Sequence, residues 1–194
     1  GTSLTGTYTV QSGDVSADLT AVSFTIGTVL DTAGNAMTST VMPASTSNIA
    51  QASALVVDGV LPTVTAFSSS TANGTFGIGG TITISATTSE AIQSGNTLTV
   101  TLDTGATVTL TAASAGTSLT GTYTVASGQS SSDLTVSSFT IGTMRDTAGN
   151  AMTSTTVPSG SSNIAGAKAL IVDTTATIAT VLQDEFENSY TLPY

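Results

Sequence analysis

The sequence predicts an all-β protein made of antiparallel β-sandwich domains in tandem. Apolar and polar residues alternate in stretches such as 81–85 (TITIS) and 98–102 (LTVTL), which is typical of strands that bury one face. Clusters of Gly, Asn, Asp and Ser separate these stretches, and one long segment of sequence occurs twice. Together these features predict short strands, tight turns and repetition of one folded unit.

The strands are expected where alternating or β-branched residues are bounded by turn residues. In chain order they are 63–67 (TVTAF), 80–87 (GTITISAT), 97–102 (TLTVTL), 107–112 (TVTLTA), 119–125 (LTGTYTV), 134–141 (LTVSSFTI), 151–156 (AMTSTT) and 167–172 (AKALIV). The turns between them are expected at 73–74 (NG), 94–96 (SGN), 103–105 (DTG), 127–129 (SGQ) and 146–150 (DTAGN). No stretch has a helical period, which favours an antiparallel sandwich.

The repeat sets the domain organisation. Residues 1–60 and 116–175 align without a gap, and roughly 42 of the 60 pairs are identical, which defines a unit of about 115 residues. We therefore expect residues 1–60 to be the second half of one unit and residues 61–175 a complete unit. Residues 176–194 are expected to be the divergent start of a third unit or a C-terminal tail. The first unit then lacks a half, which is either outside this segment or supplied by another molecule.

Composition excludes several classes of function. Two basic residues against 12 acidic ones give a formal charge of −10, which excludes nucleic acid as a partner, disfavours anionic membranes and favours cations. There is no Cys for a disulfide or a thiolate metal site, and no His for a Ser/His nucleophile. No run of 18 apolar residues occurs, so no membrane insertion is expected within this segment.

The order of four motifs carries a family resemblance. The motifs are 96–110 (NTLTVTLDTGATVTL), 118–134 (SLTGTYTVASGQSSSDL), 144–155 (MRDTAGNAMTST) and 162–176 (SNIAGAKALIVDTTA), preceded by 88–92 (TSEAI). This order resembles the bacterial immunoglobulin-like (Big) tandem repeats of large secreted adhesins and surface proteins. One departure is Thr177, which stands where the first junction has Pro62.

The resemblance implies immunoglobulin-like domains, an extracellular place on a cell surface and, often, calcium at domain junctions. The function expected is that of a non-catalytic structural or adhesive segment. Its partners would be neighbouring repeats or copies of itself, and a host or surface ligand.

Calcium is the expected cofactor, because Ca²⁺ takes six to eight oxygen ligands and the chain is acidic. In an immunoglobulin-like domain the entry linker, the loop after the second strand and the loop before the last strands meet at one end. This places Asp58, Glu90, Asp146 and Asn150 together as candidate ligands. Three further candidates are Asp31 and Asn35, at the equivalent positions of the first copy, and Asp173, which would serve a following domain. The alternative is that Asp31 and Asp146 only form turns with the glycines that follow them.

Two other functions remain open from the residues. Residues 102–106 (LDTGA) resemble the Asp-Thr-Gly signature of aspartic proteases, although the same residues make a hairpin turn, and we expect no enzyme activity. The other is a subunit of a filament, a surface layer or a virion fibre, in which one chain completes another. Residues 178–182 (IATVL), which align with 63–67, are the candidate donor strand.

Overall fold

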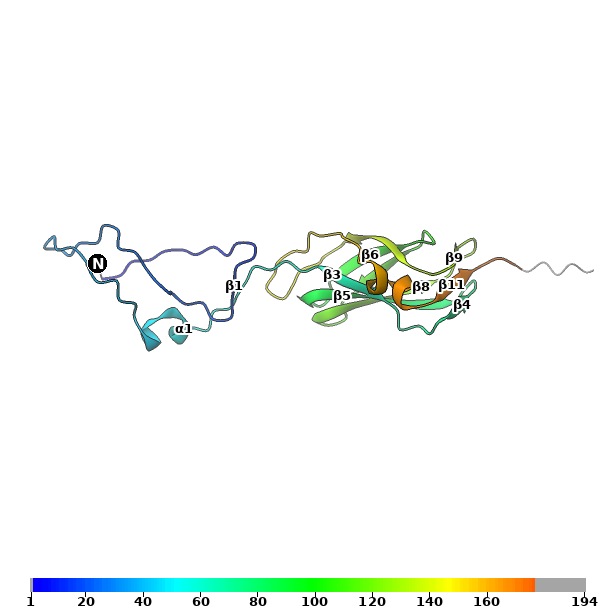
Figure 1. Cartoon of the computed structure of the whole chain (residues 1–194), viewed down its shortest axis with the longest axis horizontal. Helices are drawn as coiled ribbons and strands as arrows, with labels where there is room; N and C mark the ends of the chain where they lie inside the picture. The colour runs from blue at the N-terminus through cyan, green and yellow to red at the C-terminus, as the bar shows by residue number, and fades with distance from the viewer. Residues whose placement is uncertain (1, 177–194) are drawn as a thin grey trace, which may run out of the picture.

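The computed structural model describes residues 2–176, which form two parts that lie end to end (Figure 1). Residues 2–56 contain little regular structure, and residues 64–173 form a compact β-rich part, here called the β3–β11 body. The residues between them include strand β2 (Val57–Asp58), which pairs with β1 (Val15–Ser16) in the first part. The predicted tail or third unit from residue 177 onward, including the candidate donor strand 178–182, lies outside the described residues.

A six-stranded antiparallel sheet makes up most of the β3–β11 body. Its order is β10 (Val136–Ile141), β6 (Thr97–Leu102), β7 (Thr107–Thr111), β8 (Gly116–Thr124), β5 (Thr81–Ile92) and β3 (Val64–Ser68). A second sheet has the order β4 (Gly74–Phe76), β11 (Leu170–Asp173) and β9 (Ser130–Ser131), with β4 and β11 parallel. The all-β class predicted from the alternating pattern is confirmed.

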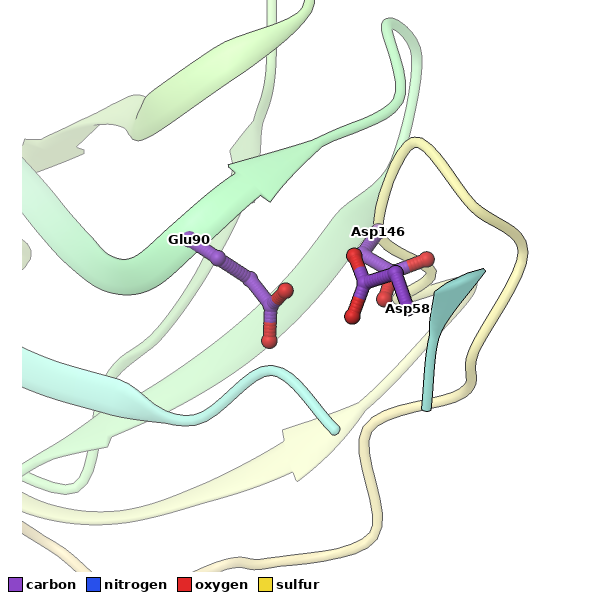
Figure 2. Close-up of side chains that lie close together, drawn as sticks. All are labelled: Asp58, Glu90 and Asp146. Atoms are coloured by element: carbon purple, nitrogen blue, oxygen red, sulfur yellow. The ribbon is translucent and has the colours of Figure 1, made fainter. Parts of the chain in front are cut away.

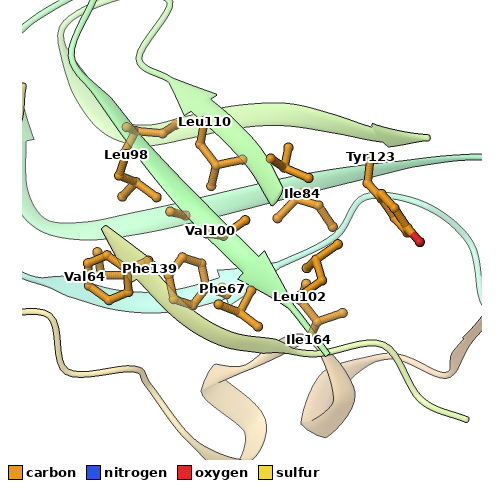
Figure 3. Packing of buried hydrophobic residues seen from close by; sticks show 14 of the residues in the cluster. Val64, Phe67, Ile84, Leu98, Val100, Leu102, Leu110, Tyr123, Phe139 and Ile164 are labelled. Atoms are coloured by element: carbon orange, nitrogen blue, oxygen red, sulfur yellow. The ribbon is translucent and has the colours of Figure 1, made fainter. Parts of the chain in front are cut away.

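The core follows from the alternation of the strands. In β6 every second residue is buried, and Leu98, Val100 and Leu102 point inward while the threonines between them do not. Figure 3 shows these side chains meeting residues of the other strands and Ile164. Phe67 of β3 and Phe139 of β10 are in edge-to-face contact, with ring centroids 5.5 Å apart. The two edge strands of the large sheet therefore share one core with the strands between them.

Two short helical turns were not anticipated, because a single turn is too short for a helical period. Helix α2 (Ile164–Ala167) follows η2 (Gly160–Ser162), and α1 (Ile49–Ala52) follows η1 (Ser45–Ser47). Each α-helix has an asparagine cap whose side-chain oxygen accepts a hydrogen bond from the next backbone N–H. Among the described residues no helix is long and apolar enough to cross a membrane.

Three details of the predicted strands were wrong. Strand β5 continues to Ile92 instead of ending at residue 87, so Glu90 lies within a strand and not in a loop after it. Residues 151–156 form no strand, and only Ala151 makes an isolated bridge, to Arg145. Strands β4 and β9 were missed because each is short and is defined by its pairing with β11.

The repeated sequence does not adopt one structure. The decapeptides 1–10 and 116–125 are identical, yet 116–124 is strand β8 whereas the described residues 2–10 contain no strand. Strand β8 lies between β5 and β7, and no equivalent of either strand adjoins residues 2–10. The pairing partners, rather than the local sequence, thus decide whether this segment is a strand.

Candidate metal centre

Three carboxylates from three segments meet where the β3–β11 body joins β2. Asp58 lies on β2, Glu90 on β5, and Asp146 in the loop that follows β10. Each offers an oxygen within 4.8 Å of the other two, and Figure 2 shows Glu90 extending toward the two aspartates. The structure therefore brings together three of the predicted ligands, which are up to 88 positions apart in the sequence.

Asp146 is the rigid member of this cluster. Its side chain is buried, and its two oxygens accept hydrogen bonds from the backbone N–H (2.8 Å) and the side-chain Nδ2 (2.7 Å) of Asn150. The loop between them turns at Gly149, whose φ of 101° favours glycine. Asn150 thus orients Asp146, and its Nδ2 also donates to the backbone carbonyl of Asp58 at 2.9 Å.

The backbone around Glu90 is fixed by hydrogen bonds near the end of β5. The preceding residue, Ser89, donates its N–H to the carbonyl of Thr63 (2.9 Å) and accepts the N–H of Thr63 on its hydroxyl (3.0 Å). The hydroxyl of Thr88 donates to the carbonyl of Glu90 at 2.7 Å. These bonds fix the backbone on both sides of the Glu90 side chain. Its Oε1 is withdrawn from solvent and has no hydrogen-bond partner among the described residues.

Asp58 connects the cluster to the first part of the chain. Its backbone pairs with Val15 of β1, and its Oδ1 accepts the N–H of Val60 at 3.1 Å. A hollow of about 360 Å³, lined by residues that include Asp58, Val60, Ser89 and Glu90, lies beside the cluster. Two of the three carboxylates, those of Asp58 and Glu90, therefore border this hollow.

The cluster carries negative charge without a basic partner. Burial is the main cause that raises the pKa of Glu90, and the charges of Asp58 and Asp146 raise it further. The neighbouring base, Arg145, is exposed and donates to the carbonyl of Gly149 at 2.8 Å. Within the described part of the chain no salt bridge neutralises these three acids.

This geometry fits a hard cation. Two oxygens bound to one Ca²⁺ at roughly 2.3–2.6 Å are at most about 5 Å apart, and the 4.8 Å limit on the three carboxylates satisfies that condition. Oxygen-only ligands and an uncompensated charge favour a hard cation such as Ca²⁺ or Mg²⁺ over transition metals, which prefer nitrogen and sulfur.

The remaining candidate ligands lie elsewhere. Asp31 accepts the backbone N–H (2.8 Å) and Nδ2 (2.9 Å) of Asn35, which repeats the Asp146–Asn150 arrangement, but in an exposed loop outside the cluster. Asp173 is exposed and accepts bonds from the backbone and hydroxyl of Thr175. Hydrogen bonds lower the pKa of both aspartates.

Asp103, the residue on which the protease alternative depends, is hydrogen-bonded to other segments of the fold. Its Oδ2 accepts the hydroxyl of Ser131 at 2.6 Å and its Oδ1 accepts the N–H of Thr135 at 3.2 Å. Gly105, with a φ of 79°, completes the hairpin turn between β6 and β7. The carboxylate therefore ties this turn to the segment that contains β9.

Two residues that support the site were not anticipated. Gln93 donates its Nε2 to the carbonyl of Asp146 at 2.8 Å, and the buried Asn96 donates its Nδ2 to the carbonyl of Arg145 at 2.9 Å. The sequence signal was the turn cluster 94–96, which indicates a bend but not the distant loop that its side chains contact.

The raised pKa of Glu90 gives the metal-free protein a specific pH dependence. The folded state binds the Glu90 proton more tightly than the unfolded chain does, so stability falls as pH rises through the raised pKa. In chelator, the melting temperature is expected to increase as pH falls from neutral toward 4.5, the ordinary value for this group. Calorimetry of the wild type and of Glu90→Gln checks this result.

Glu90→Gln is the matched control, and its melting temperature is expected to exceed that of the wild type at neutral pH in chelator. The lowered pKa values of Asp14, Asp31 and Asp173 act in the opposite direction, but only as pH falls below their ordinary value of 3.8. Equal pH slopes for the two proteins above pH 4.5 would show that Glu90 is not destabilised by its surroundings.

Comparison of the chain with protein-family models, with curated proteins and with solved structures finds no match.

Proposed function

We propose that the chain is a non-catalytic structural segment of an extracellular surface protein built from immunoglobulin-like domains in tandem. We further propose that Ca²⁺ bound by Asp58, Glu90 and Asp146 stiffens the junction between its two parts. The observation that carries the proposal is the cluster itself, in which three acids lie together with no base to neutralise them. The all-β fold, the internal repeat and the resemblance to bacterial immunoglobulin-like repeats support the structural role.

The mechanism is mechanical rather than catalytic. Asp58 belongs to the strand that pairs with residues 2–56, whereas Glu90 and Asp146 belong to the β3–β11 body. A cation bound by all three neutralises their repulsion and adds a connection between the two parts. Without the cation, the repulsion among the three carboxylates, which adds to burial in raising the pKa of Glu90, favours separation of β2 from the body.

The test is a comparison of the wild type with Glu90→Gln in Ca²⁺ and in chelator. Calcium is expected to raise the melting temperature of the wild type, with a stabilisation of about 2.7 kcal/mol when free Ca²⁺ is 100 times the Kd. Small-angle scattering is expected to give a narrower range of interpart distances with Ca²⁺. Both effects are expected to disappear in Glu90→Gln.

Asp31→Asn is the matched control for this experiment. Asp31 holds the position of Asp146 in the first copy and has the same asparagine partner, but it lies outside the three-acid cluster. Its calcium response is expected to equal that of the wild type. An identical melting temperature and scattering profile in Ca²⁺ and chelator would contradict the calcium part of the proposal.

A second candidate function is a subunit of an assembly whose chains complete one another. It is favoured by the apolar side chains of residues 2–56, several of which are exposed. Sedimentation at high protein concentration distinguishes the two, because the assembly role requires association and the tandem-segment role does not.

A further inference from the structure

Six apolar side chains of residues 2–56 are identical to side chains that form the core in the second copy. In the pairs that follow, the first residue is exposed and its equivalent is buried. The pairs are Leu4 (84% exposed) and Leu119 (0%), Tyr8 (55%) and Tyr123 (2%), Val10 (44%) and Val125 (2%), Met37 (42%) and Met152 (4%), Ile49 (41%) and Ile164 (0%), and Leu55 (46%) and Leu170 (0%). The first copy thus presents an uncovered face that we call the half-repeat face.

In the second copy these positions are covered by strands β3 to β7. Leu119 lies opposite Ala86 and Tyr123 opposite Ile82 across the β5–β8 pairing. Figure 3 shows Tyr123 and Ile164 directed into the same interior as side chains from β5, β6 and β7. A large part of the cover is therefore a segment of several strands within residues 61–115, and second-half residues such as Leu134 and Phe139 complete the same core.

We propose that the half-repeat face is the docking surface for a polypeptide segment of the β3–β7 type, with the sequence pattern of residues 61–115. The repeat supplies the complementarity, because roughly 42 of the 60 residues in 1–60 are identical to their equivalents in 116–175, and the apolar ones among those equivalents share a core with this segment in the same chain. The proposal does not depend on calcium.

The loops of the first copy are already arranged as in the completed unit. Leu19 donates to the carbonyl of Leu55 at 2.8 Å, as Leu134 does to Leu170. Three further hydrogen bonds of the first copy have an equivalent in the second. Met37 to Val29 corresponds to Met152 to Met144, and Asn48 to Ala21 corresponds to Asn163 to Val136. Tyr8 to Asp14 corresponds to Tyr123 to Gln129. These loop contacts are thus preformed, which lowers part of the entropic cost of docking, whereas residues 2–10 must still become a strand.

Gly6 gives independent support. A Cβ on its equivalent, Gly121, would lie 2.5 Å from the carbonyl oxygen of Thr109 on β7, so glycine is required there by the neighbouring strand. A Cβ on Gly6 would meet nothing within 4 Å. Glycine at position 6 has a packing reason only when a β7-type strand lies beside it.

An intact second copy does not suit this surface. Its residues 61–115 already cover its own second half, so transferring them would expose as much apolar surface as it covers. A single donated strand equivalent to β3 is also insufficient. Tyr8 and Leu4 correspond to β8 residues whose strand partner is β5, and β3 lies on the far side of β5.

The test adds a copy of residues 61–115 directly before Gly1 of the full chain, so that the copy of Ala115 precedes Gly1 as Ala115 precedes Gly116. Hydrogen exchange of residues 2–10 is measured with peptides that extend past Gln11, which distinguishes them from those that contain Ala126. Exchange in the extended chain is expected to be at least about a hundredfold slower than in the original chain. The β3–β11 body is the internal control for correct folding.

Gly6→Ala tests whether slower exchange of residues 2–10 comes from docking of a β7-type strand beside Gly6. In the original chain it is expected to leave exchange and melting unchanged, and in the extended chain it is expected to remove most of the protection of residues 2–10. Unprotected residues 2–10 in the extended chain would overturn the proposal. Protection of these residues in the original chain, with a dimer in sedimentation, would also overturn it and would assign the face to a second copy.

Discussion

Leu119→Ala is expected to lower the free energy of unfolding of the β3–β11 body by about 2–5 kcal/mol. Leu119 is fully buried on β8 opposite Ala86 of β5, so truncation removes apolar contacts and leaves a cavity in the core. Urea unfolding followed by circular dichroism measures this loss as a lower midpoint.

Leu4→Ala is the matched control, because Leu4 has the same sequence neighbours and is 84% exposed. It is expected to change the free energy of unfolding by less than about 0.5 kcal/mol. Similar losses for the two variants would mean that the first copy buries Leu4 in solution.

Asn163→Ala is expected to lower the free energy of unfolding of the β3–β11 body by about 3 kcal/mol. The buried side chain accepts the N–H groups of Val136 (3.2 Å) and Ile164 (2.7 Å) and donates to the carbonyl of Val136 (2.9 Å). Alanine leaves these backbone groups buried without partners and removes the cap of α2. Thermal unfolding measured by calorimetry is expected to show the loss as a lower melting temperature.

Asn48→Ala removes the corresponding hydrogen bonds from the first copy. Asn48 accepts the N–H groups of Ala21 and Ile49 and donates to the carbonyl of Ala21, but it is only half-buried, whereas Asn163 is buried, so water can replace more of its bonds. We expect Asn48→Ala to lower the free energy of unfolding by less than about 1 kcal/mol. Equal costs at the two positions would contradict the role assigned to burial.

The strands that could be predicted are those whose pattern reflects burial. Strand β6 has the predicted bounds because Leu98, Val100 and Leu102 alternate with threonine between clear turn residues. Residues 151–156 (AMTSTT) were also predicted as a strand, yet only Met152 is buried there and no neighbouring strand pairs with them beyond the bridge at Ala151. Period alone cannot tell whether a partner strand is present.

The identical decapeptides show the same limit most directly. Sequence reasoning assigns one structure to both, but Tyr123 is buried on a strand and Tyr8 is exposed outside one. The difference comes from strands β5 and β7, which flank only the second decapeptide; Ile82, the β5 residue opposite Tyr123, is 41 positions away from it.

The three acids of the candidate site were predicted together because the resemblance supplied a topology that places three distant segments at one end of a domain. The supporting residues Gln93 and Asn96 were not predicted, because their contacts depend on how the loop of Asp146 folds back onto the turn after β5. The placement of the acids follows from topology, whereas the bonds that support them require side-chain positions.

Strand β2 also determines what one part of the molecule can transmit to the other. Val57 pairs with Ser16 of the first part, while the next residue, Asp58, turns its carboxylate toward Glu90 and Asp146 of the body. The backbone of both residues therefore belongs with the first part, and only the carboxylate of Asp58 reaches the body. If Ca²⁺ binds the three acids as proposed, this carboxylate passes on orientation as well as length, so that twisting one part about the long axis turns the other with it.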